Sequence, residues 1–327
     1  MKLHCLAWRR RARFAAGALF LLAGLGGCAG LVPQTMQLRE AWPSGVAVKS
    51  ENSAVPFFPQ REYQCGPAAL ATALVDAGVR VSPDELVKHV FLPGRQGSLQ
   101  ADMLAAARHF SQVSYQIPPR IDALLREVAA GNPVIVLQDI GWGVFATWHY
   151  AVVVGFDYPA GELYLRSGET QRLAMPFTIF EHTWKKSNYW AMVALPPDRL
   201  AASADEAGYL AAIVAMERVG EPDAAARAYS VFLQRWPGNA GASVGLANRH
   251  YALGALAEAE ATLRRAVARH PDSVPVLNNL AQVLSDLGRH EEALAFIERA
   301  TSQTGSSLAA VAGETRALIL QRMGRSN

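Results

Sequence analysis

Cysteine is scarce in this sequence, and metal-binding patterns are missing. The 327 residues contain three cysteines, Cys5, Cys28 and Cys65. None of them has the paired Cys or His spacing of a zinc site, and neither an HExxH motif nor a glycine-rich phosphate loop occurs. The sequence therefore predicts no metal ion and no organic cofactor.

Charge of either sign is also sparse. Charged residues make up 18% of the chain, the formal net charge is +3, and four arginines lie together between Arg9 and Arg13, in a segment predicted to be removed. Nucleic-acid binding needs a basic surface on the folded protein, so the sequence gives no support for a nucleic-acid partner. A hydrophobic content of 51% excludes a disordered chain, and the length suits about two domains.

Long apolar runs are missing as well, and the longest candidate lies at the N-terminus. Lys2 and the arginine cluster precede an apolar run from Phe14 to Leu25, which is too short to span a bilayer. The run ends in small residues, the pattern of an export signal. We predict a signal peptide over residues 1–27; the alternatives are a single membrane anchor or a buried helix.

The end of that run resembles the lipobox of bacterial lipoproteins. The residues are Leu25-Gly26-Gly27-Cys28, and the resemblance implies cleavage before Cys28 and acylation of its thiol. Ala29 rather than aspartate follows, which in enterobacterial lipoproteins implies release to the outer membrane, facing the periplasm. We expect residues 28–52 to be a lipidated tether, since they are polar and weakly patterned.

Residues 53–198 combine helical patterns with strand patterns and predict an α+β domain. Helices are expected over 65–78, from 82, from 98 and over 121–130, and strands over 133–140, 149–156, 162–167 and 189–195. The turn-rich connection 157–161 makes the second and third of these strands an antiparallel hairpin. Pro196-Pro197 ends the strand region and indicates a domain boundary near residue 198.

The second half of the chain repeats itself every 34 residues. Leu253-Gly254 returns as Leu287-Gly288, and Pro237 returns as Pro271. This period and its small residues resemble the tetratricopeptide family, which implies an all-α domain over 205–322 with three units plus a capping helix. A generic helical bundle is the alternative. The resemblance implies a protein partner for the repeats.

Cys65 is the only thiol of the mature chain that is free of lipid, and it lies at the start of a predicted helix. The unpaired N–H groups and the positive end of the helix dipole favour a thiolate there. We therefore expect the pKa of Cys65 to lie well below its ordinary value. Cys65 is the candidate nucleophile, although cysteine is often simply a core residue.

A cysteine nucleophile needs a base and an oxyanion donor. His149 opens an apolar strand after a glycine-containing loop, whereas the other histidines of this domain, His89, His109 and His182, lie in surface-like contexts. We favour His149 as the base. The backbone N–H of Cys65 is one oxyanion donor, and Gln60 is favoured over Gln64 as the second.

These residues carry a family resemblance. Pro59-Gln60, Gln64-Cys65-Gly66-Pro67-Ala68 and, further on, Trp148-His149-Tyr150 resemble the papain-like peptidases typified by the bacteriocin-processing, double-glycine leader peptidases. The resemblance is strongest to lipoprotein members with C-terminal tetratricopeptide repeats. It implies that Cys65 is the nucleophile, His149 the general base and acid, and Gln60 an oxyanion donor, five positions before Cys65 where relatives usually have six.

The third catalytic member departs from the family. Relatives usually place an aspartate, followed by proline, at the end of the strand after the histidine strand; this sequence has Arg166-Ser167-Gly168 there. Asp157 lies at the other end of the hairpin and is interpreted as a turn residue. Ser167 or Glu169 could orient the ring, or Asp139 could fold in instead; Trp142, Trp148 and Trp190 either wall the cleft or belong to the core.

The sequence thus predicts an envelope-tethered cysteine peptidase that acts on a protein or peptide, with a membrane contact through the lipid on Cys28. A cysteine amidohydrolase or acyltransferase acting on cell-wall or other acyl substrates would use the same Cys65 and His149. A third hypothesis is a catalytically inactive scaffold in which the repeats carry the function.

Overall fold

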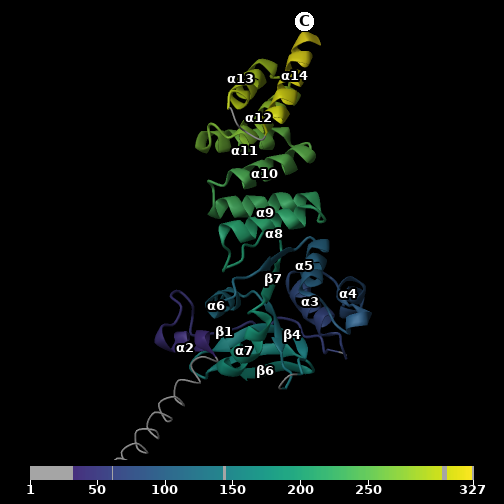
Figure 1. Ribbon diagram of the computed structural model, residues 1–327, viewed down its shortest axis with the longest axis vertical. Coiled ribbons are helices and arrows are strands. Elements are labelled where there is room, and N and C mark those ends of the chain that lie inside the picture. Colours follow the sequence, from purple (N-terminus) through teal and green to yellow (C-terminus); the bar gives the residue numbers. More distant parts are fainter. Residues whose placement is uncertain (1–31, 61, 143–144, 304–307, 326–327) are drawn as a thin grey trace, which may run out of the picture.

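The computed structural model describes residues 32–325, apart from 61, 143–144 and 304–307. Cys28 and the predicted signal segment lie outside the described residues. Within these ranges the chain forms a sheet domain followed by a stack of helices that ends at the C-terminus (Figure 1). The α+β class predicted for the first part and the all-α repeat class predicted for the second are both confirmed.

A seven-stranded antiparallel sheet organises the first domain. Its strand order is β2-β7-β3-β4-β5-β6, with β1 paired to β4. The strands are β1 (Lys49–Glu51), β2 (Val113–Gln116), β3 (Val134–Asp139), β4 (Trp148–Asp157), β5 (Glu162–Ser167), β6 (Thr170–Pro176) and β7 (Ala191–Leu195).

Helices cover both faces of this sheet, and β4 shows why. Val152 and Val154 point to one face, where they pack with α3 (Cys65–Asp76), α4 (Pro83–Val90) and α5 (Gln100–His109). Ala151 and Val153 point to the other, towards α6 (Ile121–Ala129) and α7 (Phe177–Trp184). Because successive residues of a strand alternate between faces, a strand buried on both sides reads as a continuous apolar run.

The segment expected to be a tether is folded onto this domain. Residues 33–40 form α2 (Pro33–Glu40), and β1 lies along β4. The carboxylate of the fully buried Glu181 in α7 accepts hydrogen bonds from the backbone N–H groups of Gln34 and Thr35, at 2.9 and 2.6 Å. A carboxylate at a helix N-terminus satisfies unpaired donors, so a residue far along the sequence stabilises this short helix.

The repeat domain follows the sheet domain in the chain and packs directly against it. Its helices are α8 (Glu206–Glu217), α9 (Pro222–Arg235), α10 (Ala240–Ala252), α11 (Leu256–Arg269), α12 (Val274–Asp286), α13 (His290–Thr301) and α14 (Ala309–Arg325). Tyr209 of α8 packs against Tyr115 of β2, and α8 and α9 contribute to the same core as the sheet. The first repeat helices therefore share an apolar core with the sheet domain.

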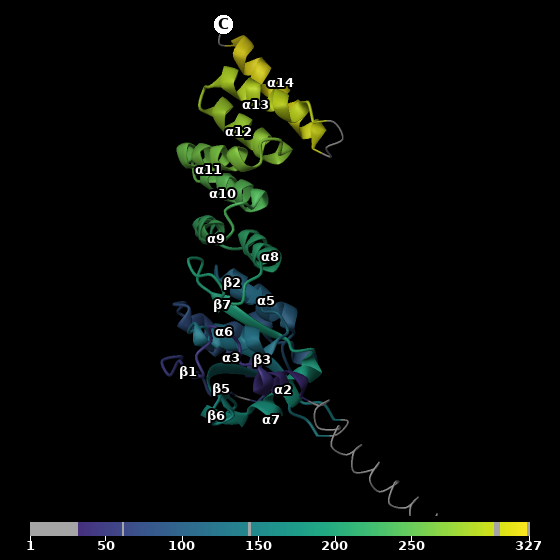
Figure 2. The ribbon, with the colours of Figure 1, turned by 90° about the vertical axis from the view of Figure 1, so that its left-hand side faces the viewer.

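The 34-residue period appears in the structure as matching turns. Gly254 follows α10 and Gly288 follows α12, both with positive φ values, of 77° and 79°. Glycine adopts this left-handed backbone without the cost of a Cβ atom. Figure 2 shows the paired helices stacked away from the sheet. Within the described residues, no helix has the length and apolar character needed to cross a bilayer.

Candidate active site

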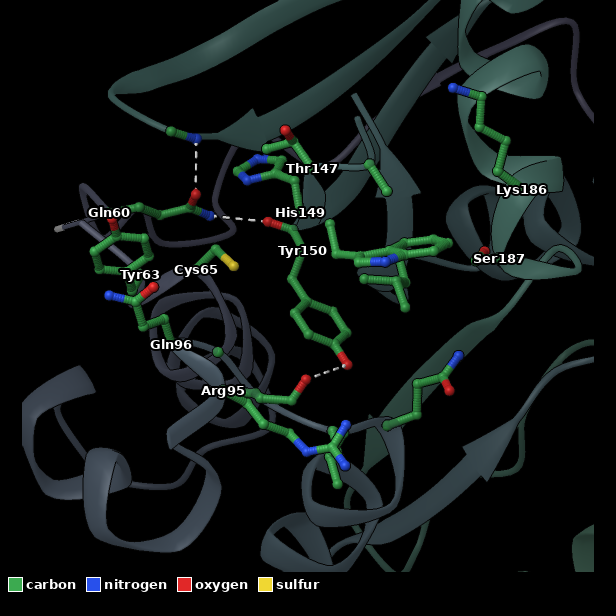
Figure 3. A pocket seen from close by; sticks show the side chains of 18 of the residues that line it. Gln60, Tyr63, Cys65, Arg95, Gln96, Thr147, His149, Tyr150, Lys186 and Ser187 are labelled. Atoms are coloured by element: carbon green, nitrogen blue, oxygen red, sulfur yellow. Dashed lines mark hydrogen bonds between the residues drawn. The ribbon is translucent and has the colours of Figure 1, made fainter. Parts of the chain in front are cut away.

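Cys65 is the first residue of α3 and lines a pocket of about 970 Å³. Its neighbour Gly66 lies against Ser98, and a Cβ atom at position 66 would come within 2.2 Å of Ser98 Oγ. Glycine is therefore required at this position for the helix to start so close to Ser98. Gln60, His149 and Gly168 line the same pocket, and Figure 3 shows Gln60, Cys65 and His149 gathered at one end of it.

Burial controls the charge state of the thiol. Desolvation raises the pKa of Cys65, and hydrogen bonds from the backbone N–H groups of Tyr150, Gly66 and Cys65 itself offset this only in part. The expectation of a lowered thiol pKa is therefore wrong for the free protein, because desolvation outweighs the helix terminus. Burial also lowers the pKa of His149. Both shifts favour the uncharged forms, a neutral thiol and a neutral imidazole.

His149 is the second residue of β4, where it faces Gln138 of β3 across the sheet. Its Nε2 atom lies 2.9 Å from Ser167 Oγ. Ser167 ends β5, beside the turn that leads into β6. When Nε2–H donates to this hydroxyl, Nδ1 is the ring nitrogen that carries a lone pair and can accept a proton.

The side-chain amide of Gln60 is held on both of its polar atoms. Its Oε1 accepts a hydrogen bond from the backbone N–H of Gly168 at 3.1 Å, and its Nε2 donates to the carbonyl of Tyr150 at 3.1 Å. An amide nitrogen has two protons. The Tyr150 bond uses one, and among the described residues no hydrogen bond is seen for the other. Gln64 has no side-chain hydrogen bond capping α3.

The alternatives for the ring orienter lie elsewhere. Asp139 accepts hydrogen bonds from the backbone N–H groups of Gly141 and Thr147 and pairs with Lys186, so its carboxylate holds the loop between β3 and β4. Glu169 is exposed in the β5–β6 turn. Asp157 ends β4, pairs with Lys49 at 2.6 Å and accepts from the N–H of Ala160, as a turn residue does.

The remaining histidines lie outside the pocket, whereas the tryptophans differ in their surroundings. His89 and His109 stack on each other, with ring centroids 4.8 Å apart, and neither they nor His182 line the pocket. Trp148 lines the pocket and Trp190 is buried in the core, whereas Trp142 is 91% exposed. Among the described residues, no three His, Cys, Asp or Glu side chains are grouped to hold a metal ion.

Arg166 holds together two segments of the site, and no role was predicted for it from the sequence. Its guanidinium is buried and donates to the carbonyls of Ser53, Val55 and Gln171, at distances of 2.5 to 3.3 Å. It thereby joins the segment that leads to Gln60 to the strands that flank Ser167. The signal was a charged residue directly after Leu163-Tyr164-Leu165 in β5, since buried charges occur where they have partners.

Comparison with known proteins identifies a family match in each half of the chain. Residues 52–192 match the Peptidase_C39 like family, and residues 218–275 and 250–313 match the tetratricopeptide repeat. No curated protein matches the chain.

Three solved structures show limited similarity. A C39-like peptidase from Bacillus anthracis is 18% identical, with 45% of this chain and 97% of that chain covered and a TM-score of 0.38. The TPR2B domain of yeast Sti1, in a pHsp70 complex, is 20% identical, with 31% and 84% covered and a TM-score of 0.29. MamA from MSR-1 is 19% identical, with 38% and 71% covered and a TM-score of 0.32.

Proposed function

Because residues 52–192 form a Peptidase_C39-like domain and the chain continues into tetratricopeptide repeats, we propose that this protein is a cysteine peptidase of the bacterial envelope. Cys65 is its nucleophile and His149 its general base and acid. The observation that carries the proposal is the shared pocket in which Cys65, His149 and the fixed amide of Gln60 meet.

The reaction begins from the neutral pair. His149 Nδ1 takes the proton of the Cys65 thiol as the sulfur attacks the carbonyl carbon of the scissile peptide bond. The negative charge moves to the carbonyl oxygen, where the backbone N–H of Cys65 and the second amide N–H of Gln60 stabilise it. Collapse of this intermediate breaks the C–N bond, His149 returns the proton to the leaving amine, and a thioester remains on Cys65.

Hydrolysis completes the cycle. His149 takes a proton from water, the resulting hydroxide attacks the thioester carbon, and the sulfur leaves as a thiol once it regains the proton. Ser167 holds the ring through Nε2 during both steps. Its hydroxyl is neutral, so it stabilises the imidazolium less than a carboxylate would.

The envelope location rests on Cys28. A lipid on that thiol would tether the chain to the outer membrane, facing the periplasm, and the repeats would recruit a protein partner. Tetratricopeptide repeats mediate protein–protein contacts, and their stacked helices form an extended binding surface.

The test is a product analysis with the mature protein and envelope fractions. New protein termini, found by mass spectrometry with wild type and lost with Cys65→Ala, are expected for a peptidase. Cell-wall peptides or transferred acyl groups released in place of new protein termini would instead assign the site to an amidohydrolase or acyltransferase. If a cellular phenotype that depends on this protein is unchanged in Cys65→Ala but is lost when residues 205–327 are deleted, the protein acts as a scaffold.

A further inference from the structure

The loop between β3 and β4 exposes large apolar side chains to solvent. Trp142 is 91% exposed and Phe145 78%, and Ile140 in the same loop is 50% exposed. A single exposed apolar residue is ordinary, but a group of this kind marks a contact surface. Neither Trp142 nor Phe145 lines the pocket, so catalysis does not account for their exposure.

The base of this loop is fixed. The N–H of Ile140 donates to the carbonyl of Thr147 at 3.0 Å, and the carboxylate of Asp139 accepts from the N–H groups of Gly141 and Thr147, at 2.9 and 2.8 Å. Lys186, which follows α7, pairs with Asp139 at 3.3 Å. The exposed side chains therefore project from a rigid base.

The segment from Glu181 to Lys186 holds both the start of the described chain and the base of this loop. Glu181 of α7 holds the first turn of α2, and Lys186, five residues later, holds the base of the loop. Figure 2 shows α2 and α7 together at the end of the molecule opposite the C-terminus. The docking of α2 through Glu181 thus fixes where the N-terminal attachment point lies relative to Trp142 and Phe145.

The remaining chain to Cys28 is short. Four peptide units separate Cys28 from Val32, so they span at most about 14 Å when fully extended. Under the proposed acylation of Cys28, on which this inference rests, α2 is held close to the bilayer surface. Tryptophan and phenylalanine are side chains suited to the interface between lipid and water.

We propose that Ile140, Trp142 and Phe145 enter the headgroup region of the lipid bilayer. The other end of the same loop is Thr147, which lines the pocket together with Trp148, the first residue of β4 and the neighbour of His149. Membrane contact by the loop therefore seats the pocket at the bilayer surface. The substrate class that fits this placement is a polypeptide segment held at the membrane, such as the stretch next to a membrane anchor.

The test uses the mature lipidated protein in vesicles of phosphatidylethanolamine and phosphatidylglycerol that contain a brominated phospholipid. Bromine quenches nearby tryptophan, so wild-type emission is expected to be quenched and Trp142→Phe to lose most of the quenched component. Phe145→Ser is expected to reduce the quenching of Trp142. Leu253→Ser is the matched control, because Leu253 is 51% exposed but lies in the repeats; it is expected to leave quenching unchanged.

Mass spectrometry of the N-terminal peptide shows whether Cys28 is acylated. A failure of the proposed membrane contact can therefore be told apart from a failure of the proposed lipid anchor. If Cys28 carries acyl chains and Trp142 is not quenched, the membrane contact is wrong while the anchor stands. If Cys28 carries no acyl chain, the anchor and this inference both fail, while the peptidase assignment is unaffected. If Trp142 is unquenched in vesicles but cross-links to a protein in native membranes, the loop binds a protein and the inference is overturned.

Discussion

Gln60 and Gly168 are joined by two hydrogen bonds, from Gln60 N to Gly168 O at 3.0 Å and from Gly168 N to Gln60 Oε1 at 3.1 Å. Gly168 directly follows Ser167, which contacts the ring of His149. One turn therefore positions both the amide of Gln60, the proposed oxyanion donor, and the hydroxyl that contacts the imidazole.

Replacing Gln60 tests the oxyanion role. Gln60→Ala removes an N–H donor aimed at the developing charge, so we expect the rate at which acetyl-Gly-Gly 4-nitrophenyl ester acylates Cys65 to fall by about 10²–10³-fold. Gln64→Ala is the matched control, because Gln64 is also a glutamine just before Cys65. A comparable loss in both variants would remove Gln60 from the oxyanion site.

Replacing Ser167 tests how the ring is held. Ser167→Ala removes one neutral hydrogen bond, and we expect the acylation rate to fall by about five- to tenfold. Ser167→Asp places a carboxylate beside Nε2 and favours the imidazolium, so the pKa of His149 should rise by about one to two units. The pH–rate profile measures this, because its acidic limb should move to higher pH. An acidic limb that stays in place in Ser167→Asp would show that position 167 does not contact the ring.

Arg166 should matter for stability more than any exposed arginine nearby. Arg166→Ala leaves the carbonyls of Ser53 and Val55 without their buried donor, which should cost about 3 kcal/mol of unfolding free energy. The exposed pair of Arg172 with Glu51 should contribute far less than these buried contacts, so Arg172→Ala is the control. Urea unfolding followed by near-UV circular dichroism compares them. Equal losses would mean that the buried contacts of Arg166 do not support the site.

Alkylation of Cys65 should depend on pH in a way that reflects burial. Because burial raises the pKa of Cys65, the thiolate is scarce at neutral pH and forms only as pH rises past the ordinary value of about 8.5. Iodoacetamide labelling of the free protein should therefore show a midpoint above this value. A midpoint well below it would mean that the helix terminus, and not desolvation, determines the charge of the thiol.

Much of the architecture could be predicted from sequence because its signals are local. The strand 162–167 has the predicted bounds, and the predicted helix at Ser82 begins with a capping box between Ser82 and Glu85. β6 was not predicted, since it is an exposed edge strand with little apolar pattern. α2 was not predicted either, because its N-terminus is stabilised by the distant Glu181.

The site shows the same division between local and distant signals. The proposed nucleophile and base could be chosen from motifs, whereas the thiol pKa could not be predicted, because desolvation depends on everything that packs around Cys65. The sequence left Ser167, Glu169 and Asp139 as candidates to orient His149, and only the folded structure shows that Ser167 contacts the ring. The buried contacts of Arg166 with Ser53 and Val55 required the folded structure, since the residues are separated by more than a hundred positions.

Under the proposed function, Cys65 attacks a carbonyl with His149 as its base. Intact-mass spectrometry of the protein treated with acetyl-Gly-Gly 4-nitrophenyl ester at pH 7 measures this directly. We expect a single acyl adduct on Cys65 in wild type, none in Cys65→Ala, and formation slowed by about 10²–10⁴-fold in His149→Ala. Equal rates in wild type and His149→Ala, or an adduct that persists in Cys65→Ala, would contradict it.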